Sequence, residues 1–220
     1  LAGGTFTQLG KAADALGKDR EERDALRKFF AKKYETDRRS DVAAAQNAVF
    51  EKVKGLMAGA DLFDISKLPE KDRLRYGPGT FGMHTLMARN LLEQGAPFVM
   101  VANGMPWDNH VFQHEIHQML VPELDRVLHC VVTDLQERGM LENTLVVAMG
   151  EFGRTPWLNA SRGRDHYPNA WSMMMTGTGL KRGVVVGGTD VDGVDPDGTS
   201  FNEQNLFATI FQALGVDPHA

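Results

Sequence analysis

Apolar residues recur every three to four positions along several stretches of the chain, which predicts amphipathic helices. The clearest stripe runs through residues 111–139, VFQHEIHQMLVPELDRVLHCVVTDLQERG. Pro122 predicts a kink or a restart within this helix, and Gly139 predicts its end. Shorter helical patterns cover residues 81–95 and 204–216. The positions that share the apolar face of the main helix are Ile116, Leu120, Leu124, Val127, Leu128, Val131 and Leu135.

Three short apolar runs interrupt the helical patterns and predict strands. They are PFVMVAN at 97–103, NTLVVAMG at 143–150 and WSMMMTG at 171–177. Short runs of this kind, apolar on both faces and flanked by helices, are typical of buried parallel strands. The order helix, strand, helix, strand, strand, helix therefore predicts an α/β fold with a mostly parallel sheet flanked by helices. The Gly- and Asp-rich stretch 183–200 is expected to form a surface turn or hairpin.

The beginning of the chain has a different character. Residues 1–59 are expected to form a charged helical region, because 9–58 combine helical spacing with few apolar positions. Two uses of this region stay open, a solvated pair of helices or a partner-binding face that includes Arg38 and Arg39. The chain starts LAGGTFTQ, without an initiator Met or a signal peptide. We therefore expect a processed protein or a piece of a longer one.

Composition and charge limit the classes of protein to which the chain could belong. Hydrophobic residues make up 42% and charged residues 24% of the 220 positions, which is typical of a globular protein. The net charge of −5 offers no basic field for nucleic acid, so no nucleic-acid partner is expected. No apolar run is long enough for a membrane helix. Cys130 is the only cysteine, which excludes an internal disulfide and predicts a buried packing role.

Candidate chemistry gathers where the predicted strands end, which is where open α/β sheets bind ligands. Asp108 and His110 follow the first strand, and carboxylate and imidazole groups together suit a divalent metal. His114 and His117 follow at helical spacing and suit a solvent-facing or capping role. Glu151 ends the second strand, where a carboxylate needs a metal, a cation or hydrogen bonds.

Basic residues accompany these candidate ligands. Arg154 is close enough in sequence to pair with Glu151, which is the alternative to metal binding by that carboxylate. SRGRDHYPNAW then places Arg164 and His166 just before the third strand, in a loop that could also be merely solvated. Guanidinium groups bind phosphate or sulfate oxygens through a planar fork of donors. We therefore predict that Arg154 and Arg164 bind an anion.

Three long motifs resemble one known family. They start RLRYGPGTFGMHTLMARN at 73, LVPELDRVLHCVV at 120 and GRDHYPNAWSMMM at 163, and they include GEFGRTP at 150–156. These stretches resemble the DUF1501 family, bacterial proteins of unknown function grouped with alkaline phosphatases and sulfatases. LENTLVVAMGEFG also resembles a sulfatase strand that reads NTLVVFTSDHG. The resemblance runs from about residue 60 to the end of the chain.

The resemblance implies an alkaline-phosphatase-like fold, of which residues 60–220 would be the C-terminal portion. It also implies two divalent metals that hydrolyse phosphate or sulfate esters, with zinc, manganese and calcium all as candidate ions. By position, Asp108, His110 and His166 would bind one metal, and Glu151 would bind the other. An exported or periplasmic location would fit the family, although localisation stays open, as do the substrate, a small molecule or glycan ester, and the oligomeric state.

The chain departs from the implied pattern at three points. Phe152 stands where a second His ligand is expected, and Glu151 replaces a shorter Asp. No apolar strand precedes Thr5 or Thr7, so no residue is assigned as the nucleophile. We expect a metal-dependent ester hydrolase, and the alternatives are a non-catalytic relative that binds an anionic glycan or protein, or a scaffold.

Overall fold

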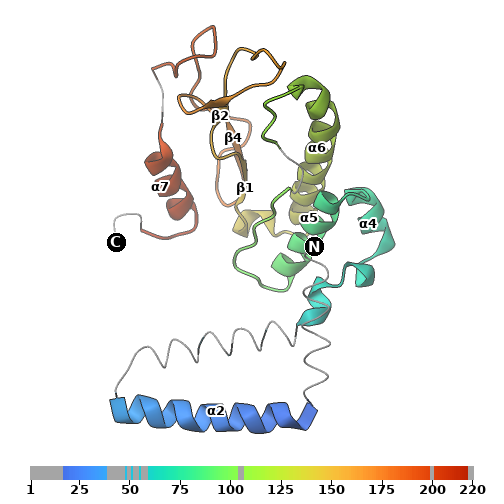
Figure 1. The fold of residues 1–220 in the computed structure, drawn as a ribbon, viewed down its shortest axis with the longest axis vertical. Helices are drawn as coiled ribbons and strands as arrows, with labels where there is room; N and C mark the ends of the chain where they lie inside the picture. Colours follow the sequence, from blue (N-terminus) through green and yellow to red (C-terminus); the bar gives the residue numbers. More distant parts are fainter. Residues whose placement is uncertain are drawn as a thin grey trace. The chain divides into compact units, whose positions relative to one another are not determined.

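The computed structural model describes residues 17–38, 48, 51, 55, 59–103, 107–198 and 201–217. The chain divides into two compact units, residues 1–69 and 70–220. In the first unit, helix α2 covers Gly17–Arg38, within the region predicted to be helical (Figure 1). Two short 3-10 helices follow, η1 at Ala60–Phe63 and η2 at Ile65–Lys67. Arg38 belongs to α2, but its side chain and Arg39 lie outside the described residues, so the proposed basic face stays a prediction.

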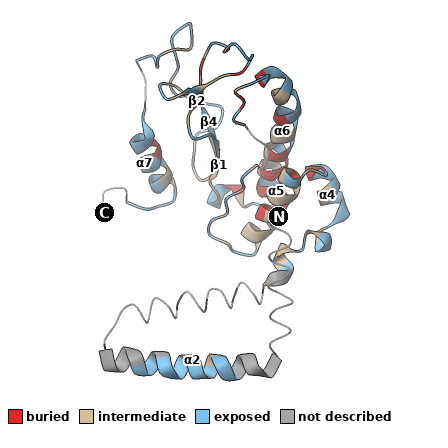
Figure 2. Cartoon of the chain, viewed as in Figure 1, coloured by how far each residue is buried: buried red, intermediate tan, exposed pale blue. Residues whose placement is uncertain are grey.

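Three helices form the core of the second unit. They are α4 at Glu70–Tyr76, α5 at Thr80–Glu93 and α6 at Gln113–Glu137, followed by the 3-10 helix η3 at Leu141–Asn143. The predicted helices at 81–95 and 111–139 are thereby confirmed, and Pro122 lies inside α6 without ending it. Buried positions gather where α5 and α6 face each other (Figure 2). Members of the predicted stripe that are buried are Leu120, Val127, Val131 and Leu135.

A buried ionic network connects the three helices. Asp134 on α6 is fully buried and accepts a hydrogen bond of 2.9 Å from the Tyr76 hydroxyl at the end of α4. Arg89 on α5 lies 3.4 Å from Asp134 and pairs with Asp72 at 2.8 Å and Glu93 at 2.7 Å. Charges are found in a core only where they are paired. The network therefore fixes the positions of α4 and α5 against α6, the helix that starts beside the candidate site.

The strands form two small antiparallel sheets rather than one parallel sheet. Strand β1 at Val146–Met149 pairs with β4 at Met173–Thr176. Strand β2 at Gly153–Arg154 pairs with β3 at His166–Tyr167. The mixed α/β class is confirmed, but the mostly parallel, alkaline-phosphatase-like sheet is not supported by the described residues. The predicted parallel direction was wrong for these strands, because an apolar run indicates burial and carries no information on the direction of its neighbour.

The remaining elements differ in how well they match expectation. Residues 97–103, predicted as a strand, belong to neither sheet of the described residues, and Phe98 and Met100 are both 79% exposed. That prediction was wrong because a strand needs a hydrogen-bonded neighbour as well as an apolar sequence. The closing helix was predicted correctly as α7, Glu203–Ala213. Asn202 starts it with a reciprocal capping box, which satisfies backbone donors of the first turn.

Candidate metal centre

The short β2–β3 ribbon brings together residues that are far apart in sequence. Arg154 lies directly opposite His166 in the antiparallel register. The loop between the two strands folds back onto the segment before α6, where Val111 forms a bridge with Arg162. Asn159 stabilises this contact, because its side-chain amide donates a hydrogen bond to the carbonyl oxygen of His110 at 3.0 Å. The fold thus places the loop before α6 against the loop between β2 and β3.

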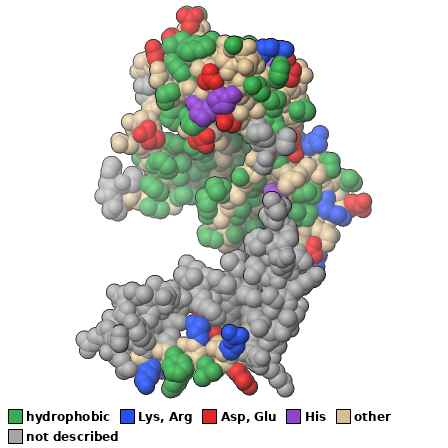
Figure 3. Space-filling view, in the orientation of Figure 1, with side chains coloured by type: hydrophobic (Ala, Val, Ile, Leu, Met, Phe, Trp, Pro, Cys, Tyr) green, Lys and Arg blue, Asp and Glu red, His purple; other side chains and the backbone are tan. Residues whose placement is uncertain are grey.

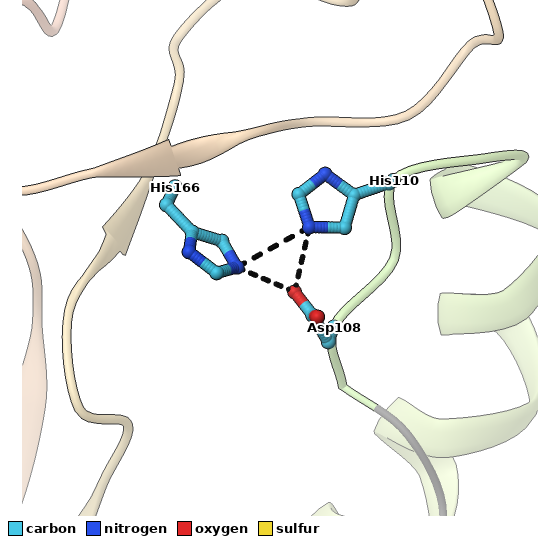
Figure 4. A group of neighbouring side chains, drawn as sticks. All are labelled: Asp108, His110 and His166. Carbon is cyan, nitrogen blue, oxygen red and sulfur yellow. Dashed lines mark hydrogen bonds and ion pairs between the residues drawn. The ribbon is translucent and has the colours of Figure 1, made fainter.

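Three side chains of the types that can bind a metal meet at this junction. The Oδ1 atom of Asp108 lies 2.8 Å from His166 Nε2 and 3.0 Å from His110 Nε2, and the two nitrogens are 3.2 Å apart (Figure 4). Tetrahedral zinc, with bonds near 2.0–2.1 Å, separates its ligand atoms by about 3.3 Å. The three donor atoms therefore need only a small outward movement to hold an ion. They form a candidate metal group among the described residues.

The group is open to solvent on one side. The side chains of Asp108, His110 and His166 are 56%, 42% and 49% exposed. In the surface view, imidazole groups lie at the surface with carboxylates beside them (Figure 3). A site with three protein ligands and a free position is typical of catalytic rather than structural zinc sites. The arrangement thus leaves room for water or a substrate atom next to an ion.

Asp165 orients one of the candidate ligands. Its Oδ1 atom accepts a hydrogen bond from His110 Nδ1 at 2.7 Å and another from the Asn159 amide at 3.1 Å. These hydrogen bonds, the one from His110 first, hold the pKa of Asp165 below its usual range. Because a carboxylate can only accept, His110 donates from Nδ1 to Asp165, and in its neutral form the ring has the lone pair of Nε2 available for an ion. Metal-binding histidines in proteins are generally held in this way.

The charge of Asp108 is partly neutralised by protein groups. His166 Nε2 donates to Asp108 Oδ1, so this nitrogen would have to give up its hydrogen to bind an ion. The guanidinium of Arg154 reaches the same oxygen at 2.6 Å. These hydrogen bonds, from His166 first and then Arg154, lower the pKa of Asp108 to about 2. Asp108 is therefore ionised at neutral pH, which is the state a metal ligand requires.

The comparison with protein families agrees with these motifs. The model of a family described as protein of unknown function (DUF1501) matches residues 8–220. The chain belongs to the DUF1501 family. No curated protein and no solved structure gives a significant match. Across the described part of the chain, no helix has both the length and the apolar character required to cross a membrane.

Three of the four predicted metal ligands lie together in this DUF1501 chain. Asp108, His110 and His166 come together, whereas Glu151 is exposed and is not part of the group. The alternative pairing of Glu151 with Arg154 is not seen either, because Arg154 pairs with Asp108. Glu151 lies in the bend between β1 and β2 and is exposed there, outside the group of three.

The other predicted residues surround the group without joining it. The Arg164 guanidinium donates a hydrogen bond to the carbonyl oxygen of Thr155 and so stabilises the loop between β2 and β3. Phe152, at the position where the resemblance implies a His, packs its ring 4.2 Å from the His166 ring. The ring of His117 lies against that of Trp107 in a tilted arrangement, with 5.4 Å between the ring centroids. His117 is thus half-buried rather than solvent-facing, and burial, followed by the charge of His114, lowers its pKa.

Two residues of the site were missed by sequence reasoning. Neither Asp165 nor Asn159 was predicted to belong to the site. The signal for Asp165 was its place next to His166, but its partner is His110 on the other loop. Asn159 accepts from the backbone N–H groups of Ser161 and Gly163 at 2.9 and 3.0 Å, which shapes the loop. Such a turn-forming role is common for Asn between strands and gave no metal signal.

Proposed function

We propose that this DUF1501 chain binds a divalent metal ion through Asp108, His110 and His166 and uses it to hydrolyse phosphate or sulfate esters. The observation that carries the proposal is the convergence of one carboxylate oxygen and two imidazole nitrogens, with Asp165 orienting His110. A divalent ion supplies Lewis-acid polarisation of an ester oxygen and a more acidic water. The reaction class itself rests on the family resemblance.

The chemistry of the three donor side chains limits which metal ions would suit the site. Two imidazoles and one carboxylate suit zinc or manganese, whereas calcium prefers an all-oxygen shell. The free side of the group would admit the ester, and Arg154 stands beside it with a guanidinium suited to an anionic oxygen. Arg164 would contribute by bracing the loop, or by its positive charge. The residues of the chain thus bind and orient, and no described residue is assigned as a nucleophile.

A second candidate function is favoured by Phe152 and Glu151. The resemblance implies two metals, but Phe152 cannot ligate and Glu151 stands apart from the group. A single ion without a nucleophile is sufficient to bind an anionic group. The alternative is therefore a metal-dependent protein that binds a sulfated or phosphorylated glycan or protein and does not hydrolyse it.

Metal binding is tested by elemental analysis and by titration of the metal-stripped protein with zinc or manganese. One equivalent bound by the wild type, and lost in His166→Ala, would support the site. His84→Ala is a matched control, because His84 lies on α5 outside the group. Equal metal content in the wild type and His166→Ala would overturn the assignment.

Hydrolysis separates the two candidate functions. The metal-loaded protein is incubated with aryl phosphate and aryl sulfate esters, beside the metal-stripped protein and beside His110→Ala treated with the same metal. Turnover that depends on His110 and on the metal would support the hydrolase. Tight binding of phosphate or sulfate with no turnover of either ester would favour the non-catalytic alternative.

A further inference from the structure

We propose that Arg154 couples anion binding to metal binding. Without metal, its guanidinium is held by Asp108, and a divalent ion that takes Asp108 releases Arg154 to bind a phosphate or sulfate group. This inference rests on the proposed metal site and adds to it a rule for the order of binding. The anion would bind weakly until the metal is in place.

The coupling follows from a shared oxygen atom. Asp108 Oδ1 contacts Arg154 Nη2 at 2.6 Å and also lies within 3.0 Å of both imidazole nitrogens. A metal held by the two imidazoles would need this same oxygen. A carboxylate oxygen shared with a divalent ion is a poorer acceptor for a guanidinium, and the ion repels the guanidinium directly. The metal and Arg154 therefore compete for Asp108.

The pair is weak enough to exchange. Asp108 is 56% exposed and Arg154 is 21% exposed, and ion pairs of this kind contribute little because solvent screens them. By contrast, the Asp165 contact to His110 does not use a donor atom needed by the metal, because it involves Nδ1. Metal binding would thus displace Arg154 and leave the contact between Asp165 and His110 in place.

A divalent ion would change the charge balance of the site. The two negative charges of Asp108 and Asp165 are offset by Arg154 and by Arg164 of the same loop, so these groups together carry no net positive charge. A divalent ion would add two positive charges and so attract an anion. Without metal, moreover, the guanidinium fork of Arg154 is already engaged. Both effects favour anion binding only after metal binding.

The position of Arg154 keeps it near the site after release. Its backbone is fixed in β2 opposite His166, and paired residues of this kind project on the same face of a ribbon. The guanidinium also lies 5.6 Å from the ring of Phe152 and 3.4 Å from the carbonyl oxygen of Arg164. These contacts do not involve Asp108. A released guanidinium would therefore stay beside the ion, where its fork suits a phosphate oxygen pair.

Calorimetric titration of inorganic phosphate, with and without saturating manganese, tests the proposal on the whole chain. We expect phosphate to bind at least ~5-fold more tightly with manganese present, and manganese to bind more tightly with phosphate by the same factor. In Arg154→Gln, manganese binding should persist and the coupling factor should fall towards one. Arg154→Lys should restore part of the coupling, since it keeps the charge and loses the fork.

Arg182→Gln is the matched control, because Arg182 also forms an exposed ion pair, with Glu142 at 3.1 Å, outside the metal group. It should leave the coupling unchanged, and thermal unfolding checks that both Gln variants are folded. Phosphate affinity that is equal with and without manganese, or coupling that survives in Arg154→Gln, would overturn the inference while leaving the metal site intact. A wild-type chain that binds no manganese and no zinc would overturn the proposed function and this inference together.

Discussion

Asp165 and His110 are joined by a hydrogen bond of 2.7 Å between Oδ1 and Nδ1, across two loops that are 55 positions apart in sequence. The bond fixes the His110 ring so that Nε2 faces Asp108 and His166. We predict that Asp165→Ala lowers metal affinity by roughly 10–100-fold although no proposed ligand is changed. Titration of the metal-stripped variant with zinc gives the affinity.

Asp192→Ala serves as the control for this change, because Asp192 is an exposed carboxylate of the later loop and is not part of the metal group. Its metal affinity should equal that of the wild type. An Asp165→Ala variant that binds zinc as well as the wild type would show that His110 is not oriented by this bond.

The position of Glu151 leads to a second prediction. Because it lies in the bend between β1 and β2 and outside the candidate group, Glu151→Gln should leave zinc affinity unchanged. His166→Ala, measured alongside, should abolish binding. A loss in Glu151→Gln comparable to that in His166→Ala would support the metal-ligand role that the family resemblance implies for Glu151.

The helices were predictable because their signal is local. The stripe of residues 111–139 needs only neighbours three or four positions away, and α6 follows it closely. Strand pairing depends on distant segments, so the antiparallel register of Val147 with Met175 was not contained in either apolar run. The run at 97–103 has the composition of a strand but belongs to neither sheet of the described residues.

The candidate site was predicted only in part, because its residues come from loops that are distant in sequence. The family resemblance aligned Asp108, His110 and His166 with one metal, and the structure brings these three together. Glu151 was expected at the rim of a parallel sheet, an edge that the described residues do not form. The role of Asp165 depends on the direction in which the His110 ring points, which no spacing rule contains.

Gly163 is packed against the backbone of His110, and this close approach gives a third prediction. A Cβ atom at Gly163 would collide with the carbonyl group of His110 and the amide of Val111. Gly163→Ala should therefore push the two loops apart and weaken zinc binding. Gly198→Ala is the control, because a Cβ atom there meets nothing within 4 Å. Equal zinc affinity in both variants would contradict the close approach of the loops.

The buried network predicts a large loss of stability. Asp134 is fully buried and accepts a hydrogen bond from Tyr76, so Asp134→Ala leaves the buried Tyr76 hydroxyl without its acceptor. Arg89 loses one of its three acidic partners and keeps Asp72 and Glu93. The expected loss is about 1–3 kcal/mol in the free energy of unfolding, measured with urea. Asp125→Ala, at an exposed position of the same helix, should change it by less than about 0.5 kcal/mol. A small effect of Asp134→Ala would mean that water reaches the network and replaces the lost carboxylate as hydrogen-bond acceptor.

Tyr76 predicts how stability falls at alkaline pH. Burial raises the pKa of its phenol from 10.0 to about 12, so the folded chain keeps the proton that the unfolded chain releases. The resulting contribution to stability is complete below the unfolded pKa near 10 and is lost as the pH rises through about 12. Tyr76→Phe has no proton to release and should lose less stability over this window. Urea unfolding of both proteins across that pH range measures the difference, and parallel declines would show that Tyr76 ionises as easily in the folded chain as in the unfolded one.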